Sequence, residues 1–353
     1  MTEILCIGNP IVDIYIDIDK DIAQKYGITE PAQHIDREIV DAILSDPLID
    51  FSKVLRCSGG GAANVAKIAA MLGMNTIFSG CTGRDDLASF FEDEIKSAGV
   101  CAELIKSDSK TGICFACNIS GGALRFAACP GAAHDFTEAN ISDEMISGAE
   151  VIVLDGYILS RRPLVQHILL KASRLGIPAA LDAASVFQVK AKAEEILTYS
   201  RNFPLFIFMN ADEAIAFYNT IKKVNDDNDT GAKYLNMTEK EKEAIILRDI
   251  SPMLKIITDG ELYPIIVVKL GGRGAVVFAG GSAYYEEAFA IIPRSTVGAG
   301  DAFCAAFVSA WIRGKSLSEC AALGNKVARE ILEVPGTRIK SAKLKTFAKY
   351  LQK

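Results

Sequence analysis

One stretch decides the expected fold and chemistry: Thr296-Val297-Gly298-Ala299-Gly300-Asp301-Ala302-Phe303. Its small residues come directly before a run rich in Ala and Phe, which predicts a helix over 301–311. Successive N–H groups at such a helix start can point into one concavity, where the helix dipole favours an anion. Asp301 could take a proton from an alcohol, and phosphoryl transfer needs both features. The alternative is an ordinary helix cap, an Asp after a glycine turn.

A second glycine-rich stretch lies far upstream, at Cys57-Ser58-Gly59-Gly60-Gly61-Ala62-Ala63-Asn64. Three glycines before a helix start let a ligand approach the backbone closely. The Asn64 amide can both donate to and accept from a hydroxyl. The alternative is a turn at a helix start, with Asn64 in a structural hydrogen bond. A dinucleotide-binding motif is not indicated, because Asn64 replaces the third glycine of that pattern.

The rest of the chain predicts an α/β protein, because short apolar runs alternate with longer amphipathic ones. Strands are expected at 4–7, 76–78, 151–154, 179–181 and 206–209, and helices at 65–72, 87–98, 164–175 and 317–332. The strictly alternating run 13–19 predicts a strand with one wet face. A hairpin is expected around Gly121-Gly122, and a strand meander over 265–286. The polar stretch 225–229 predicts a solvated loop inside a surface insertion at 219–258.

Composition excludes several classes of function. Of the 353 residues, 50% are hydrophobic and 23% charged, and the formal net charge is −6. That balance argues against a protein that binds the nucleic-acid backbone, which needs a basic face. No apolar run reaches the roughly 18 residues of a membrane span, and the N-terminal residues lack the features of a signal peptide. The nine cysteines are expected to be buried thiols. We therefore expect a cytoplasmic protein with no nucleic-acid and no membrane partner.

The two glycine-rich stretches together resemble the signatures of the PfkB, or ribokinase-like, family of carbohydrate and nucleoside kinases. Gly59-Gly60 through Asn64 is similar to the amino-terminal signature, and 296–303 to the carboxy-terminal one. The opening Gly8-Asn9-Pro10-Ile11-Val12-Asp13-Ile14 and the pair Thr111-Gly112 resemble the adenosine kinase branch. The likeness covers nearly the whole chain. It implies one kinase domain with a doubly wound, mainly parallel sheet flanked by helices, and a small β-rich lid from 14–55 and 105–133.

The resemblance implies a role for each residue of the two stretches. Asp301 would be the general base, and the backbone amides of Gly298, Ala299 and Gly300 would form an anion hole. The acceptor would be bound by Asp13, Gly59, Gly60 and Asn64. Apolar residues for a base would come from a set that could equally be lid core: Phe115, Phe126 and Cys129.

For the phosphate donor, the resemblance implies ATP with Mg²⁺. Asn210 and Glu213 match the family's N-x-x-E motif and would organise Mg²⁺ through water. Their alternative is a helix cap with Glu213 at its third position. ATP would contact the turn and helix residues Lys269, Gly271, Gly272, Gly274 and Asn325. Hairpin glycines and a helix-surface Asn are the alternatives there.

Two departures from the family pattern leave questions open. Ser295 stands where the signature usually begins with Asp, so activation by a monovalent cation such as K⁺ is left undecided. The 219–258 insertion has no assigned counterpart. The resulting hypothesis is an ATP-dependent kinase of a primary hydroxyl on an adenosine-like nucleoside or a sugar, as a monomer or homodimer. A kinase of a free sugar such as ribose or fructose, and a binding protein without catalysis, remain the alternatives.

Overall fold

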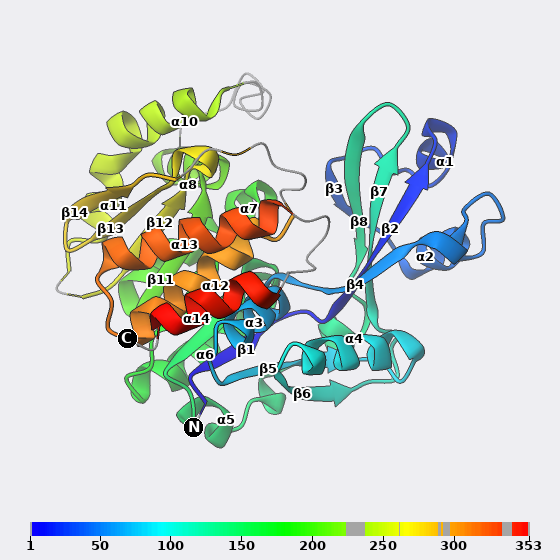
Figure 1. The fold of residues 1–353 in the computed structure, drawn as a ribbon, viewed down its shortest axis with the longest axis horizontal. Helices are drawn as coiled ribbons and strands as arrows, with labels where there is room; N and C mark the ends of the chain where they lie inside the picture. Colours follow the sequence, from blue (N-terminus) through cyan, green and yellow to red (C-terminus); the bar gives the residue numbers. More distant parts are fainter. Residues whose placement is uncertain are drawn as a thin grey trace.

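Two β-sheets organise the chain in the computed structural model, which describes residues 2–223, 237–260, 262–288, 291, 297–333 and 341–351. The large sheet has the strand order β14 (Ser282–Glu286), β13 (Ala275–Ala279), β12 (Ile265–Lys269), β11 (Leu205–Asn210), β10 (Ala179–Asp182), β9 (Val151–Asp155), β1 (Ile4–Ile7), β5 (Thr76–Thr82) and β6 (Cys101–Lys106). The small sheet has the order β3 (Ala32–His34), β8 (Ala123–Cys129), β7 (Gly112–Ile119), β2 (Ile11–Ile18) and β4 (Leu55–Gly59). Figure 1 shows the small sheet standing to one side of the large one.

The large sheet is parallel from β6 through β12, and β13 and β14 run antiparallel at its other edge. The strands predicted from apolar runs are therefore confirmed, as is the doubly wound α/β class. Strand alignment places the carboxyl ends of β9, β10, β11 and β12 at one edge of the sheet, where open α/β sheets bind their ligands.

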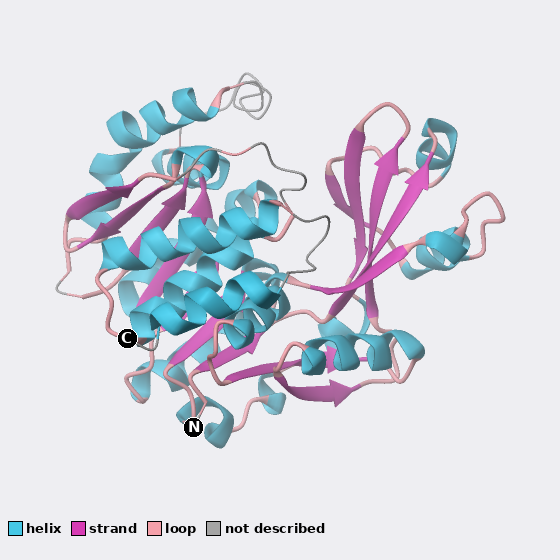
Figure 2. Ribbon diagram, viewed as in Figure 1, coloured by secondary structure: helices cyan, strands magenta, loops and turns pink. Residues whose placement is uncertain are grey.

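Helices cover both faces of the large sheet (Figure 2). One face carries α3 (Gly61–Met71), α4 (Asp86–Ser97), α12 (Ala299–Ile312), α13 (Leu317–Leu332) and α14 (Ser341–Leu351). The other carries α5 (Asp143–Ser147), α6 (Arg162–Arg174), α7 (Val186–Asn202), α8 (Ala211–Lys222) and α11 (Ser251–Ile257). Aromatic packing fixes α12 on the sheet, because Phe307 meets Phe208 edge-on at 5.4 Å between ring centroids. No helix in these described residues is long and apolar enough to cross a membrane.

The small sheet is covered on one face by α1 (Lys20–Lys25) and α2 (Arg37–Leu44). Ile14, Ile16 and Ile18 of β2 point into this core and are at most 4% exposed. Asp13 and Tyr15 lie on the opposite face and are only partly buried. The alternating run thus forms the predicted strand with one wet face.

The stretch predicted as a surface insertion needs correction in its second half. Residues 225–229, the predicted solvated loop, lie outside the described residues. After them come α10 (Glu239–Ile245), a π-helical turn (Ile246–Ile250) and α11. Ile246, Ile250 and Leu254 of this segment are fully buried in the core beneath α8. The segment is therefore part of the helical layer as well as of the surface.

Candidate active site

The two glycine-rich stretches meet at one hydrogen bond. Asn64, in the first turn of α3, donates through Nδ2 to Asp301 Oδ2 at 2.9 Å, across 237 residues of sequence. Gly298 is the N-cap residue of α12, and Asp301 stands inside the first helical turn. The alternative of a capping Asp does not describe Asp301, because the N-cap residue is Gly298. The alternative of a structural hydrogen bond for Asn64 is met by this contact with Asp301. The bond holds an amide and a carboxylate side by side at two helix starts.

The start of α12 presents backbone N–H groups beside that carboxylate. Gly298 has φ of +79°, which turns the chain into the helix, and its carbonyl accepts the first intrahelical bond from Ala302 N at 2.9 Å. The N–H groups of Ala299, Gly300 and Asp301 therefore have no acceptor within the helix. A Cβ on Gly300 would lie 3.1 Å from Lys269 Nζ, so a lysine ammonium sits directly beside this helix start. The arrangement suits an anion.

Asp301 has the ionisation expected of a base that works near neutral pH. Burial raises its pKa to about 6, and the nearby Asp182 carboxylate adds to the rise. The hydrogen bond from Asn64 and the charge of Lys269 oppose it. A carboxyl group with this pKa is mostly ionised at pH 7 and still a stronger base than an ordinary aspartate.

Four neighbouring strands end in polar side chains at the same edge. Asp155, Asp182, Asn210 and Lys269 are the last residues of β9, β10, β11 and β12, and cross-strand alignment pairs Asp182 with Asp155 and Asn210 with Lys269. Lys269 Nζ binds Asp182 Oδ2 at 2.6 Å, and both side chains are 13% exposed. Burial favours the neutral lysine, but Asp182 and Glu213 outweigh burial and raise the pKa of Lys269.

The other glycine loop leaves room for one carboxylate. A Cβ on Gly59 would stand 2.2 Å from Asp13 Oδ2, and a Cβ on Gly60, with φ of +96°, would stand 2.2 Å from the Asn9 carbonyl oxygen. Only glycine fits at either position. Burial raises the pKa of Asp13 to about 7, Lys67 opposes the rise, and Asp301 adds to it. Asp13 and Asp301 are thus close enough for the charge of Asp301 to raise the pKa of Asp13.

Comparison with known proteins agrees with this geometry. The chain matches the family described as pfkB family carbohydrate kinase over residues 24–344. The chain belongs to this family. It is accordingly an ATP-dependent kinase that acts on a sugar or a nucleoside.

Individual relatives of the pfkB family resemble the chain along its whole length. An adenosine kinase of Schizophyllum commune is 24% identical, with 97% of this chain and 98% of the relative aligned. The crystal structure of adenosine kinase from Sinorhizobium meliloti has a TM-score of 0.81 at 23% identity and covers 99% of both chains. A probable sugar kinase protein from Rhizobium etli CFN 42 has a TM-score of 0.79 at 24% identity, covering 100% of this chain and 99% of its own. These structural likenesses establish the fold.

Asn210 and Glu213 form the capping box that was the alternative to a metal role. Asn210 N and Nδ2 donate to the two oxygens of Glu213 at 2.8 and 2.7 Å, and Glu213 N donates to Asn210 Oδ1 at 2.9 Å. Burial raises the pKa of Glu213 to about 7, Asp182 adds to the rise, and Lys269 opposes it. In the described residues no cluster of three or more His, Cys, Asp or Glu side chains could hold a metal. Kinases of this family use ATP and Mg²⁺ generally, and the oxygen atoms of Asn210 and Glu213 are of the kind that a hydrated Mg²⁺ accepts.

The residues predicted for the nucleotide fall in two places. Gly271, Gly272 and Gly274 form the turn after β12, with φ of +60° at Gly271 and +101° at Gly274. Asn325 of α13 donates through Nδ2 to the carbonyl oxygens of Glu286 and Glu287, at 3.2 and 3.3 Å. Its amide thus ties α13 to the end of β14. Lys269 lies in neither place, because its Nζ is beside Gly300 at the start of α12.

The three residues expected beside a base divide between the two faces of the small sheet. Cross-strand alignment puts Phe126 on the face of Asp13 and Tyr15, through Ala116. Phe115 is fully buried and, like Cys129, faces the covered side. Tyr157, which follows β9, is 39% exposed; burial of its hydroxyl raises the pKa of that group, and the carboxylates of Asp155 and Asp301 add to the rise.

The sequence analysis did not predict a further cluster of polar side chains, which surrounds Asp155. This carboxylate is 3% exposed and accepts from the backbone of Asn9 at 3.4 Å and of Tyr157 at 3.1 Å. Arg161 donates to Asn9 Oδ1 and to the carbonyl of Ala133. The sequence feature that could have identified this residue is an aspartate at the end of a run that predicts a buried parallel strand.

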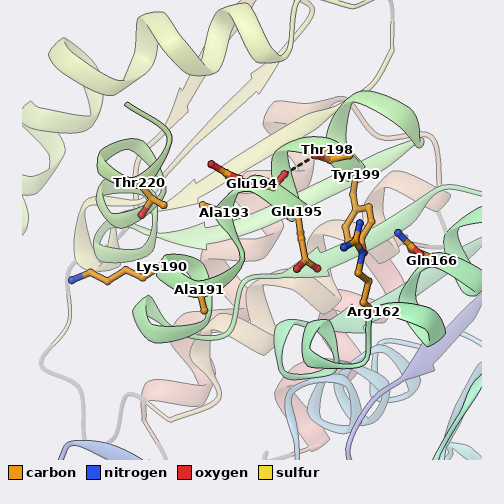
Figure 3. Close-up of a pocket in the computed structure, with 10 residues that line it drawn as sticks. All are labelled: Arg162, Gln166, Lys190, Ala191, Ala193, Glu194, Glu195, Thr198, Tyr199 and Thr220. Carbon is orange, nitrogen blue, oxygen red and sulfur yellow. Dashed lines mark hydrogen bonds between the residues drawn. The ribbon is translucent and has the colours of Figure 1, made fainter. Parts of the chain in front are cut away.

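A separate polar pocket of about 420 Å³ lies between helices (Figure 3). Its walls come from α6, α7 and Thr220 of α8: Arg162, Gln166, Lys190, Ala191, Ala193, Glu194, Glu195, Thr198, Tyr199 and Thr220. It shares no residue with the site described above. Ser295 and Thr296, on which the expectation about K⁺ depends, lie outside the described residues.

Proposed function

We propose that this kinase transfers the γ-phosphoryl group of ATP to a primary hydroxyl of a nucleoside, with adenosine the first acceptor to test. The observation that carries the proposal is the Asn64–Asp301 hydrogen bond. It places a group able to bind an acceptor hydroxyl next to a carboxylate of raised pKa and beside a helix start able to hold phosphoryl oxygens.

In the proposed reaction, the acceptor hydroxyl gives its proton to Asp301 and its oxygen attacks the γ-phosphorus. The bond from that phosphorus to the β,γ-bridging oxygen breaks, and ADP leaves with the electron pair. The N–H groups of Ala299, Gly300 and the helix start, with Lys269 beside them, stabilise charge on the transferred oxygens. Asn210 and Glu213 would hold Mg²⁺ through water, and the ion would supply positive charge for the ATP phosphates.

Asp13 supplies the acceptor's hydroxyl contacts in this proposal. Its carboxylate rests on Gly59, where no side chain could fit, so a vicinal diol can approach the loop backbone and the carboxylate together. Asn64 completes the hydroxyl contacts from α3. The small sheet, as the proposed lid, would close over the diol and exclude the water that competes for the phosphoryl group.

A nucleoside is favoured over a free sugar by the aromatic side chains around Asp13. Tyr15 and Phe126 share its face of the small sheet. Tyr157, in the turn after β9, lies near enough to Asp301 for that carboxylate to raise the pKa of its hydroxyl. Aromatic side chains on the same face as a diol-binding carboxylate suit a ribose that carries a base. ATP would lie along the Gly271–Gly274 turn towards Asn325.

The test is an ADP-release assay with purified protein, Mg²⁺ and ATP across adenosine, other nucleosides, ribose, fructose and phosphorylated sugars. Strong turnover with adenosine and none with free sugars is expected. Turnover with a free sugar alone would overturn the nucleoside assignment and leave the role of Asp301 intact. Omitting and restoring Mg²⁺ and K⁺ in the same assay tests each cation, and sedimentation of the purified protein distinguishes a monomer from a homodimer.

A further inference from the structure

A buried lysine lies behind the acceptor loop without being part of either signature. Lys67, on α3 one turn after Asn64, is 7% exposed. Its Nζ donates to the Ser58 carbonyl at 2.6 Å and to Ser58 Oγ at 3.0 Å. Ser58 is the residue before Gly59, at the point where β4 of the small sheet leads to α3 of the large one. Both hydrogen-bond acceptors are neutral, which is unusual for a buried ammonium.

The connection from β4 to α3 is held by a second side chain as well. Ser58 N donates to Glu94 Oε2 at 2.5 Å, and Glu94 belongs to α4 of the large unit. Lys67 and Glu94 thus hold the two ends of one residue, the carbonyl and the N–H. The connection from β6 to β7 is held by an acid: Thr111 donates through N and Oγ1 to the two oxygens of Asp85 at 2.9 and 2.6 Å, and its Oγ1 accepts from Gly83 N at 3.0 Å. No lysine takes part in these three hydrogen bonds, so the ammonium at Ser58 is the feature that sets its connection apart.

The charge of Lys67 has a second use, at Asp13. Asp13 pairs across the strands with Cys57, the neighbour of Ser58, and its carboxylate lies on Gly59. Lys67 is the cation that opposes the effect of burial on Asp13. The other groups that bear on Asp13 or Lys67 are acids or thiols of the surrounding strands and helices: Tyr15, Cys57, Glu94, Cys114 and Asp301.

Asp13 must be ionised for its proposed task. A carboxylate accepts hydrogen bonds from two hydroxyls through two equivalent charged oxygens, whereas a protonated carboxyl uses one oxygen as a donor and accepts more weakly. Burial opposes ionisation, so a nearby cation is needed to maintain it. We propose that Lys67 is a positioning residue that, through the charge it holds at Ser58, keeps Asp13 ionised and the acceptor loop in place. This inference rests on the proposed function of Asp13 in binding the acceptor.

The kinetic test compares K67M and K67Q with wild type over pH 5.5–9, with adenosine as the acceptor. K67Q keeps an N–H donor for Ser58 but loses the charge. In both variants the rise in acceptor KM towards low pH should begin about one pH unit higher, which makes KM about fivefold larger near pH 7 and about ninefold larger near pH 6. The KM for ATP should change little. T111V is the matched control, because it loosens the connection from β6 to β7 without removing a charge and should leave the pH profile in place.

An unfolding cycle tests the coupling without any substrate. Denaturant unfolding is measured at pH 8 for wild type, K67M, D13N and the double variant. D13N should stabilise the K67M protein more than it stabilises wild type, because the carboxylate has then lost its cation. Equal effects of D13N in both backgrounds, or a K67Q profile that superimposes on wild type, would overturn the proposal. A wild-type protein that shows the coupling but no adenosine turnover would instead contradict the nucleoside assignment.

Discussion

The substitution Asp301→Asn separates the catalytic role of this residue from its structural one. The asparagine keeps the size of the side chain and retains an oxygen that can accept from Asn64 Nδ2, as the carboxylate does at 2.9 Å. It loses the proton acceptor. The variant is therefore expected to fold, to bind acceptor and ATP, and to lose turnover.

Two magnitudes follow from the environment of Asp301. A positioned general base contributes roughly 10²–10⁴ in rate, so kcat should fall by at least about a hundredfold. A pKa of about 6 in the free protein makes wild-type kcat/KM for ATP fall as pH drops through 6, to about a tenth of its plateau at pH 5. The carboxylate is the active form, so activity is retained above this pH.

The same raised pKa predicts a gain in stability for the variant. A carboxyl group whose folded pKa lies above its unfolded value destabilises the fold once pH exceeds the unfolded pKa, near 4. Asp301→Asn removes this destabilisation and should raise the free energy of unfolding at pH 8 by up to about 3 kcal/mol. The gain should be smaller than this limit because the side chain is partly exposed to solvent. The gain should vanish near pH 3.

The assay pairs ADP release over pH 5–9 with urea unfolding at pH 3 and pH 8. Low turnover together with higher stability at pH 8 is expected, and misfolding would produce the opposite change in stability. A variant that keeps more than about a tenth of wild-type turnover would refute the assignment of Asp301 as general base.

Three further substitutions test the neighbours of this residue. Asn64→Ala removes a donor that lowers the pKa of Asp301, so the acidic limb of kcat/KM for ATP should move to higher pH in the same ADP-release profile. Gly59→Ala would place a Cβ 2.2 Å from Asp13 Oδ2; steady-state kinetics should show acceptor KM raised by an order of magnitude or more, about 1.4 kcal/mol per tenfold, with little change in the KM for ATP. Lys269→Met leaves a buried carboxylate unpaired, which should cost roughly 3–5 kcal/mol of unfolding free energy in urea titrations.

Apolar runs predicted the strands of the large sheet because a strand buried on both faces needs them. The sequence of β2 also indicated which of its own residues face the covered side, since the strand alternates strictly. The alignment of β7 and β8 with β2 was not available from sequence. Phe115 and Cys129 therefore remained candidates beside a base until the pairing placed them on the opposite face from Asp13.

The buried half of the 219–258 stretch was missed for a related reason. Ile246, Ile250 and Leu254 recur at intervals of four, but the exposed pair Arg248–Asp249 lies between them and makes the window polar. Asp155 and Asp182 were missed because a single aspartate after an apolar run also marks an ordinary turn. Which of those aspartates share an edge depends on strand order, and strand order depends on contacts far apart in sequence.

The charges brought together at this edge explain why so many of their pKa values are displaced. The acids of the site outnumber its bases by two: Asp13, Asp155, Asp182, Glu213 and Asp301 against Lys67, Arg161 and Lys269. Burial raises the pKa of several of these acids, and a nucleoside triphosphate such as ATP would add further negative charge. Further negative charge in such a site raises the electrostatic cost of binding, although the N–H groups at the start of α12 and the Lys269 ammonium offset part of that cost. The excess of acid therefore supports, independently of any motif, the proposal that the phosphate donor binds together with its own metal cation.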